Sequence, residues 1–267
     1  MNVQYSIHAD NIRWLKKNAS EHTIMSEGII SSLAEEMKKD GIPSPAEAYR
    51  IFSSLSGDNT DSGMFALLCR HLNDSNGYVL ESVDVPKMTT YLRVPAADKA
   101  FAHFSKLYKG LGASYSTDFK SACEDVYYDR VDSCILPLES SSDGLSSAFR
   151  HMMLKYELKI TSAVKIVTNE DSYQIMALLT GGFTDPLGDI CEICLPGLSP
   201  HKLYEAIRVF EVFSAEVIRI TSIPSRLGDS HDQHVCIKVS PEAVPSLRYT
   251  LDGLYPANIL LGQYKKY

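Results

Sequence analysis

The residues best suited to chemistry stand in one short run, where a carboxylate and several hydroxyls follow an apolar segment. Residues 134–138 have the pattern of a short buried strand, and the polar residues that follow are Glu139, Ser140, Ser141 and Gly144. If a helix begins next, its first turn and these side chains meet at the carboxyl end of a strand, where α/β sheets bind polar ligands. The same hydroxyls could equally do no more than cap that helix. No nucleophile-elbow glycines surround these serines, so we expect no catalytic triad there.

Two cysteines and two histidines could form a zinc ligand set: Cys191, Cys194, His231 and His234. Residues three apart on a strand point to opposite faces, so the two cysteines should not reach one metal. A redox role for Cys191 and Cys194 is less well supported than a zinc site, because the motif does not start a helix that would lower a thiol pKa. We expect small buried thiols beside a polar loop, and we expect neither a metal nor another cofactor.

The composition narrows the class of protein and of partner. A chain of 267 residues can form two or three small domains, and its net charge of -7 argues against a nucleic-acid partner, which requires a basic face. No apolar run is long enough to span a membrane, and the first ten residues lack a signal-peptide pattern. The cysteines lack the dense spacing of a disulfide framework, so the sequence predicts a cytoplasmic protein with reduced thiols.

The elements expected to position these residues change character along the chain. Residues 1–88 show helical spacing, and the run Ser44-Pro45-Ala46-Glu47 carries the cap, proline and glutamate of a helix start. Residues 89–180 alternate short strands and helices, which is typical of an α/β lobe. We expect strands at 91–94, 113–116, 134–138, 158–167 and 173–179. We expect helices at 96–109, at 142–154, and from a cap at Thr117 to 128.

The last third of the chain follows a glycine-rich stretch. Residues 181–188 contain three glycines and a proline and are interpreted as a linker. Residues 189–267 then give the order β-α-β-β-α-β, which suits a ferredoxin-like unit. The predicted fold class is therefore mixed α/β and α+β: a helical segment, one α/β lobe and a C-terminal ferredoxin-like domain.

The run 136–144 resembles the signature Pro-Ile-Glu-Asn-Ser-x-x-Gly of prephenate dehydratases, with Ser140 in place of the asparagine. Leu158-Lys159-Ile160 follows like the Leu-x-Ile of that family. The resemblance implies a lobe of the periplasmic-binding-protein type. It also implies a substrate-binding role for Glu139, Ser140, Ser141 and Gly144.

A second resemblance lies beyond the predicted linker. Residues 220–226 resemble the Ile-Glu-Ser-Arg-Pro-Ser-Arg of the ACT regulatory domains attached to these enzymes, and residues 199–207 resemble the helix entry before it. In that family the two segments hold phenylalanine between two subunits. The resemblance therefore implies a homodimer or higher homo-oligomer with an amino-acid effector, and effector-binding positions at His201, Lys202, Leu203, Ser222, Pro224, Ser225 and Arg226.

The chain departs from the family where the catalytic domain should end. The family's Asn-x-Thr-Arg-Phe is replaced at Asp171, Ser172 and Tyr173, which removes the arginine that would clamp a carboxylate. Gly144 and Asp171 stand only 27 positions apart, where the family inserts a second lobe. The sequence therefore predicts a shortened chain that lacks one lobe, and we assign it no catalytic residue.

A helical segment in front of such a lobe also resembles bifunctional enzymes that begin with a chorismate mutase. That mutase binds two carboxylates through several basic side chains. The basic residues available here are Arg13, Lys16, Lys17, Lys38, Lys39, Arg50 and Arg70. They do not match the mutase positions one by one, and the alternative is that they are surface charges on a packing module.

Three functions follow from these observations. The first is a catalytically degenerate relative of prephenate dehydratase that binds a small molecule, an aromatic amino acid by expectation, and acts as a regulatory dimer. The second is an active enzyme of phenylalanine biosynthesis, either a prephenate dehydratase-like lyase or a chorismate mutase. The third is a protein interaction module. Turnover of prephenate or chorismate separates the second from the others.

Overall fold

The computed structural model describes residues 23–39, 41–56, 60–73, 85–142, 144–182, 184–225 and 231–267, leaving aside the side chains of 23–26, 145, 200 and 201. The chain forms two compact units, Met1–Leu80 with Leu195–Asn258 and Glu81–Cys194 with Ile259–Tyr267. Each unit combines helices and strands, so the predicted mixed α/β class is confirmed. Within the described residues, no helix has both the length and the apolar character needed to cross a bilayer.

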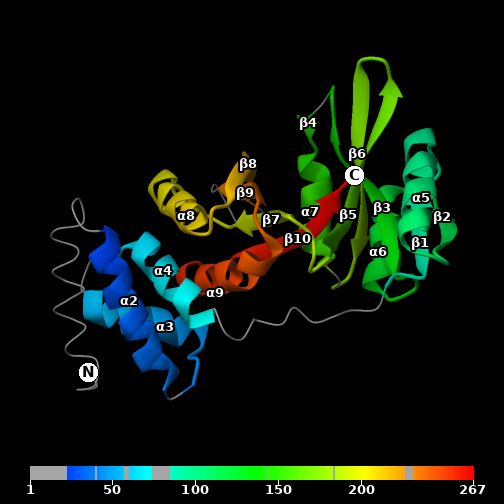
Figure 1. The fold of residues 1–267 in the computed structure, drawn as a ribbon. Helices are drawn as coiled ribbons and strands as arrows, with labels where there is room; N and C mark the ends of the chain where they lie inside the picture. The colour runs from blue at the N-terminus through cyan, green and yellow to red at the C-terminus, as the bar shows by residue number, and fades with distance from the viewer. Residues whose placement is uncertain are drawn as a thin grey trace. The chain divides into compact units, whose positions relative to one another are not determined.

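The first unit is built mainly from helices. They are α2 (Thr23–Lys38), α3 (Pro45–Ser56), α4 (Ser62–Asn73), α8 (Pro200–Val212), the short 3-10 helix η2 (Pro241–Ala243) and α9 (Val244–Leu254). The predicted helix start is confirmed, since the Glu47 N–H donates to Ser44 Oγ at 3.3 Å with Pro45 at the first position. Helices α3 and α4 lie beside α9, and α2 packs against α4 (Figure 1). Phe52, Phe65 and Tyr249 are buried in their common core.

The second unit contains an α/β lobe. Its elements are β1 (Met88–Leu92), α5 (Pro95–Leu107), β2 (Gly112–Ser116), α6 (Phe119–Tyr127), β3 (Ser133–Ser140), β4 (Gly144–Leu145), α7 (Ser147–Lys155), β5 (Lys159–Asn169) and β6 (Ser172–Thr180). Two further strands, β7 (Ile190–Leu195) and β10 (Ile259–Lys266), extend the sheet in the order β2-β1-β3-β6-β5-β10-β7. Strand β1 is parallel to β2 and β3, whereas β6 is antiparallel to β3 and β5.

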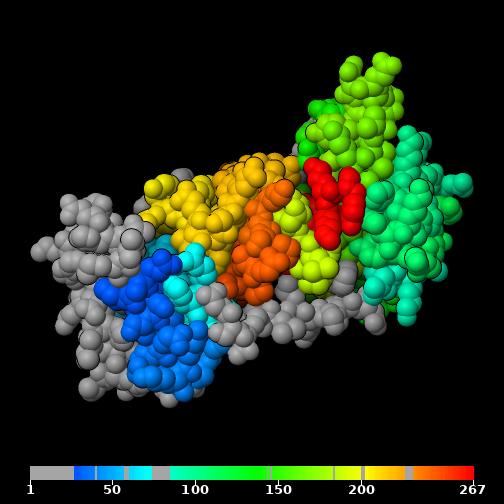
Figure 2. All heavy atoms as spheres, in the orientation of Figure 1, coloured from blue at the N-terminus to red at the C-terminus, as the bar shows by residue number. Residues whose placement is uncertain are grey.

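Helices cover both faces of this sheet. Successive residues of a strand point to opposite sides, so each strand packs against helices on both faces. Ile135 of β3 packs in a cluster with Phe104 of α5. The neighbouring Cys134 points the other way, where its thiol meets Cys123 of α6. The hairpin of β5 and β6 extends beyond these helices, and its tip stands out from the surface (Figures 1 and 2). The carboxyl ends of β1, β2 and β3 therefore lie at one edge of a sheet covered on both sides.

The thiols are expected to be unreactive in the native protein. All six cysteines are buried. Burial raises the pKa of Cys69, and a hydrogen bond with Cys123 together with burial raises the pKa of Cys134. Because the thiolate is the nucleophile, titration with a chromogenic disulfide at about pH 8 should label almost none of them until the chain is unfolded, and all six afterwards. Rapid labelling of native protein would contradict this burial.

Two expected boundaries are wrong. Helix α6 begins at Phe119 with Asp118 as its cap, because the Asp118 carboxylate accepts the Ser121 N–H at 2.7 Å, a role that was expected of Thr117. Helix α7 begins at Ser147 and not at 142. The intervening residues extend the sheet instead, since β4 pairs antiparallel with β3 and the Ser146 N–H donates to Leu138 O.

The last third has the predicted β-α-β-β-α-β order: β7, α8, β8 (Glu216–Pro224), β9 (His231–Lys238), α9 and β10. Strand β8 pairs antiparallel with β9, and β10 pairs antiparallel with β7, as in a ferredoxin-like unit. Strand β10 also pairs parallel with β5, which is why β7 and β10 group with the lobe in the second compact unit. The boundaries at 88, 181 and 189 remain predictions.

The last residues of the stretch 181–188, which was interpreted as a linker, pack against β10. Gln263 Nε2 donates to Pro186 O at 3.1 Å and to Gly188 O at 3.0 Å. A Cβ at Gly188 would lie 2.4 Å from the Tyr264 backbone nitrogen, so only glycine fits this approach.

Candidate functional site

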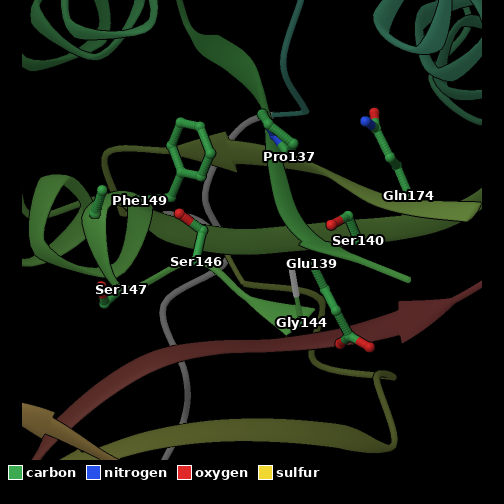
Figure 3. Close-up of a pocket in the computed structure, with 9 residues that line it drawn as sticks. Pro137, Glu139, Ser140, Gly144, Ser146, Ser147, Phe149 and Gln174 are labelled. Atoms are coloured by element: carbon green, nitrogen blue, oxygen red, sulfur yellow. The ribbon is translucent and has the colours of Figure 1, made fainter. Parts of the chain in front are cut away.

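A pocket of about 410 Å³ lies at the carboxyl end of β3. Strand β3 contributes Pro137, Glu139 and Ser140, and Gly144 follows them. The remaining wall comes from residues 146–149 at the start of α7 and from Gln174 of β6 (Figure 3). A ligand bound here would meet a strand end and a helix start, as the sequence predicted for this run.

A bulge in β3 sets the direction of the acidic side chain. Pro137 pairs with Met176 and Glu139 pairs with Ile175, so Leu138 is an extra residue in the ladder. Proline has no N–H to donate, and bulges are among the few places that accept it within a sheet. Because of the bulge, Glu139 points away from the side on which Pro137 and Gln174 lie (Figure 3).

Helix α7 presents its first turn to the pocket. Its cap residue Ser146 makes no side-chain hydrogen bond to the turn, and Ser147 and Ala148 line the cavity. Uncapped N–H groups of a first turn can donate to an oxygen of a ligand. Gly144 has φ 67, a left-handed conformation that suits glycine at the tight turn between β3 and β4.

An aromatic side chain forms the apolar wall. Phe149 lines the pocket, and its ring packs edge-on against Phe119 of α6 at 5.0 Å between centroids and 86° between planes. Phe149 and Pro137 lie on the same side of the pocket (Figure 3). Phe119 thus fixes one wall against which a flat ring could pack.

The hairpin of β5 and β6 supports the signature loop. Tyr173 Oη donates to Glu139 Oε1 at 3.3 Å, and the Tyr173 N–H donates to Ser141 Oγ at 3.0 Å. The Ser141 N–H donates in turn to Tyr173 O at 2.9 Å. Ser141 therefore continues the pairing with β6, whereas Glu139, Ser140 and Gly144 line the pocket.

The three positions that replace the family's Thr-Arg-Phe lie near the hairpin tip. Asp171 is exposed in the turn, and the Ser172 and Thr168 hydroxyls are 2.8 Å apart. The Lys165 ammonium lies 4.3 Å from the centre of the Tyr173 ring. None of Asp171, Ser172 and Tyr173 is among the described lining residues of the pocket.

A buried ion pair that the sequence analysis missed anchors α7. The side chains of Arg150 and Glu192 are 1% and 6% exposed, and Arg150 Nη2 lies 2.6 Å from Glu192 Oε2. Tyr264 Oη donates to Glu192 Oε1 at 2.8 Å. The signal was a glutamate inside the apolar run of β7, since a buried carboxylate requires a partner. Arg150, which follows Phe149 on α7, is thereby turned to β7 and β10.

The charge of the pocket follows from these placements. Among the nine lining residues that the structure describes, Glu139 is the one ionisable side chain. Arg150, the arginine nearest in sequence to the lining residues, is bound to Glu192. The pocket thus offers a carboxylate, hydroxyls, an amide and an apolar wall, and its described lining holds no cation.

The expected effector positions that the structure describes lie in the first unit. Lys202 and Leu203 are in the first turn of α8, Ser222 and Pro224 are on β8, and Ser225 follows. The loop before α8 reaches β9, since the Gly197 N–H donates to Asp232 Oδ1 at 3.1 Å, and Asp232 is the ladder partner of Ile223. The side chain of His201 and the whole of Arg226 lie outside the described residues.

Ser222 takes part in a hydrogen bond along this end. Its hydroxyl donates to Gln233 Oε1 at 2.8 Å, and Gln233 is buried. The loop before α8 and the end of β8 are therefore brought together, as the sequence suggested for these two segments.

The basic residues of the helical segment are engaged with nearby carboxylates. Lys38 lies 3.0 Å from Glu35, and Arg70 lies 2.9 Å from Glu27. Two further pairs are Lys39 with Glu36 at the end of α2 and Arg50 with Glu47 on α3. Arg13, Lys16 and Lys17 lie outside the described residues. Among the described residues, no group of three or more His, Cys, Asp and Glu side chains could hold a metal.

The fold is that of a mixed α/β protein of the prephenate dehydratase type. Among solved structures, the chain is similar to a prephenate dehydratase from Streptococcus mutans at 15% identity and a TM-score of 0.55, covering 67% of this chain and 98% of that one. A prephenate dehydratase from Arthrobacter aurescens in complex with L-Phe matches at 14% identity and a TM-score of 0.54, over 67% of this chain and 90% of that one.

A third similar structure is GqqA, described as a novel type of quorum quenching acylase, at 18% identity and a TM-score of 0.52, over 67% of this chain and 94% of that one. No protein-family model and no curated protein matches the chain. At these identities the likeness concerns the fold alone, and one fold can carry different reactions. The matches take in nearly the whole of each solved chain. The expected absence of one lobe stays a prediction.

Proposed function

We propose that this chain is a catalytically degenerate relative of the prephenate dehydratases, and that it acts as an amino-acid-binding regulatory dimer. The charge of the pocket is the observation that supports the loss of catalytic activity. Its described lining contains Glu139 and no lysine or arginine. Arg150 stands next in the chain to the pocket wall, but its guanidinium is committed to Glu192.

A dehydratase of this type must hold a substrate with two carboxylates. Arginine is the side chain that binds carboxylates in a planar, bidentate manner, and removing it costs both energy and orientation. The Glu139 carboxylate, which accepts the Tyr173 hydroxyl, acts in the opposite direction, because like charges repel. The pocket chemistry therefore supports a protein that does not turn over prephenate.

The regulatory part of the proposal places an amino acid at the end of β8. The loop before α8 is fixed to β9 through Gly197 and Asp232, and Ser222 stands beside it on the exposed edge of the hairpin. The similar structure from Arthrobacter aurescens contains L-Phe, which makes phenylalanine the first ligand to try. Pairing of two chains along this end would complete a site between them, as the sequence resemblance implies.

We expect calorimetric titration of the purified protein with L-phenylalanine to show binding, and sedimentation to show a dimer. Ser222→Ala removes the hydroxyl that joins β8 to Gln233 and should lower the affinity about tenfold, since one hydrogen bond contributes about 0.5–1.5 kcal/mol and its loss also leaves Gln233 unsatisfied. The matched control is Ser32→Ala, an exposed serine of α2 in the same unit, which should bind as the wild type does.

Incubation with prephenate and with chorismate is the second arm of this test. We expect no turnover of either compound. Turnover of one of them that disappears on Glu139→Gln would establish an enzyme instead. A monomer that gives no heat with any aromatic amino acid would leave the interaction module as the remaining candidate.

A further inference from the structure

One side of the pocket at the end of β3 is lined by uncharged groups. Phe149, Pro137 and Gln174 lie there, and the Glu139 side chain points away from them (Figure 3). The cavity measures about 410 Å³, within the range of roughly 300–1,000 Å³ that is typical of small-molecule sites. The edge-on contact with Phe119 holds the Phe149 ring in place. A small ligand can therefore occupy this side without reaching Glu139.

Neither sign of ligand charge finds a partner among the described residues on this side. Glu139 Oε1 accepts the Tyr173 hydroxyl at 3.3 Å, and the Arg150 guanidinium, one residue beyond Phe149, lies 2.6 Å from Glu192. An ammonium or carboxylate group placed against the Phe149 ring would lose part of its hydration without gaining an ion pair. An uncharged ligand avoids this cost.

The Gln174 amide is the polar group that can anchor such a ligand. Gln174 lies on β6, where its backbone is in register with Ser140 of β3 and Ile166 of β5. Its side-chain amide has no hydrogen-bond partner among the described residues. A primary amide presents a donor and an acceptor side by side, so it can exchange two hydrogen bonds with another carboxamide. A carboxylate uses only the donor, and an ammonium group uses only the acceptor.

We propose that this side of the pocket binds a small uncharged aromatic amide, with the ring against Phe149 and Pro137 and the carboxamide paired with Gln174. The ring buries apolar surface on both partners, and the paired amides satisfy each other's polar atoms. This ligand is different in charge from a dicarboxylate and from the zwitterionic amino acid proposed for the effector site. The two sites share no residue.

Three probes with the same ring and similar length separate charge from shape. They are 3-phenylpropionamide, 3-phenylpropionate and 3-phenylpropylamine, which are neutral, anionic and cationic near neutral pH. Calorimetric titration of the full chain should show one amide bound per chain, and both charged probes should bind about tenfold more weakly or worse, because their charge is unpaired. Either charged probe binding as tightly as the amide, or no binding of the amide, would overturn this assignment.

Gln174→Glu tests the anchor while keeping the size of the side chain. The new carboxylate gives an ammonium group a partner, so 3-phenylpropylamine should bind about tenfold more tightly than it does to the wild type, and the amide about tenfold more weakly. Asn169→Asp is the matched control, since it makes the same amide-to-acid change at the exposed end of β5, outside the described pocket lining. Thermal melts would verify that both variants are folded. An unchanged order of the three probes in Gln174→Glu would reject Gln174 as the anchor.

Phe149→Leu tests the position of the ring. It should weaken the amide about two- to tenfold, because an aromatic contact is replaced by an aliphatic one. An unchanged affinity would show that the ring does not lie against Phe149. The outcome is distinguishable from that of the effector site. Amide binding without L-phenylalanine binding would contradict only the regulatory proposal, and L-phenylalanine binding without amide binding would contradict only this one.

Discussion

Replacing Arg150 with methionine is expected to lower the free energy of unfolding by about 3–5 kcal/mol. The change leaves Glu192 as a buried carboxylate on β7 with a hydrogen bond from Tyr264 but without its 2.6 Å guanidinium partner. Methionine fills much of the space of the arginine stem, so lost packing is a minor part of the effect. Chemical denaturation followed by far-UV circular dichroism would measure the change.

The double variant Arg150→Met with Glu192→Leu tests the cause. If the loss comes from an uncompensated charge, removing the carboxylate should recover most of the stability. The control is Arg130→Met, which breaks the exposed contact of Arg130 with Asp125 and should cost about 0–1 kcal/mol. Equal losses in Arg150→Met and Arg130→Met would show that the buried pair does not anchor α7.

The order of helices and strands could be predicted because it depends on local patterns. The capping pattern at Ser44 and Glu47 predicted the start of α3. The strands expected at 158–167 and 173–179 lie close to the observed bounds of β5 and β6. A proline or glycine acts through its own backbone, so such signals need no knowledge of the remaining fold.

The partners of the strands could not be predicted in this way. The sequence pattern places a last strand at residues 258–264, but it does not reveal the parallel pairing of β10 with β5, which joins Gly262 to Ile160 across the chain. The ion pair between α7 and β7 is equally non-local, since it links Arg150 to Glu192. Long-range contacts of this kind depend on how the whole sheet is ordered.

In the candidate site too, the residues set by local patterns could be predicted, and those set by long-range pairing could not. Glu139, Ser140 and Gly144 were found because they follow a strand and precede a helix. Phe149 and Gln174 were missed, because the later start of α7 and the bulge at Leu138 decide which side chains face the pocket. Ser141 was expected to meet a ligand, and its place in the ladder with Tyr173 depends on the same register.

Gly262→Ala is expected to destabilise the second unit by about 3 kcal/mol, near the upper end of the cost of inserting atoms into a packed site. A Cβ at this position would lie 2.5 Å from Ile160 O and 2.7 Å from Ile160 Cβ. Neither the backbone of β5 nor a β-branched side chain can move aside freely. The alanine can therefore be accommodated only if β10 separates from β5.

The location of this damage can be measured as well as its size. In the wild type, the Lys165 N–H donates to Tyr267 O and the Tyr267 N–H donates to Ala163 O, each at 2.9 Å. Both amides should exchange with solvent faster in Gly262→Ala, because local opening of the β5–β10 ladder exposes them. Gly181→Ala is the control, since nothing lies within 4 Å of its added Cβ and its stability should change by about 0.5 kcal/mol or less. If the two variants were equally stable and equally protected, β10 would not pair with β5 in this register, and the grouping of β7 and β10 with the lobe would be wrong.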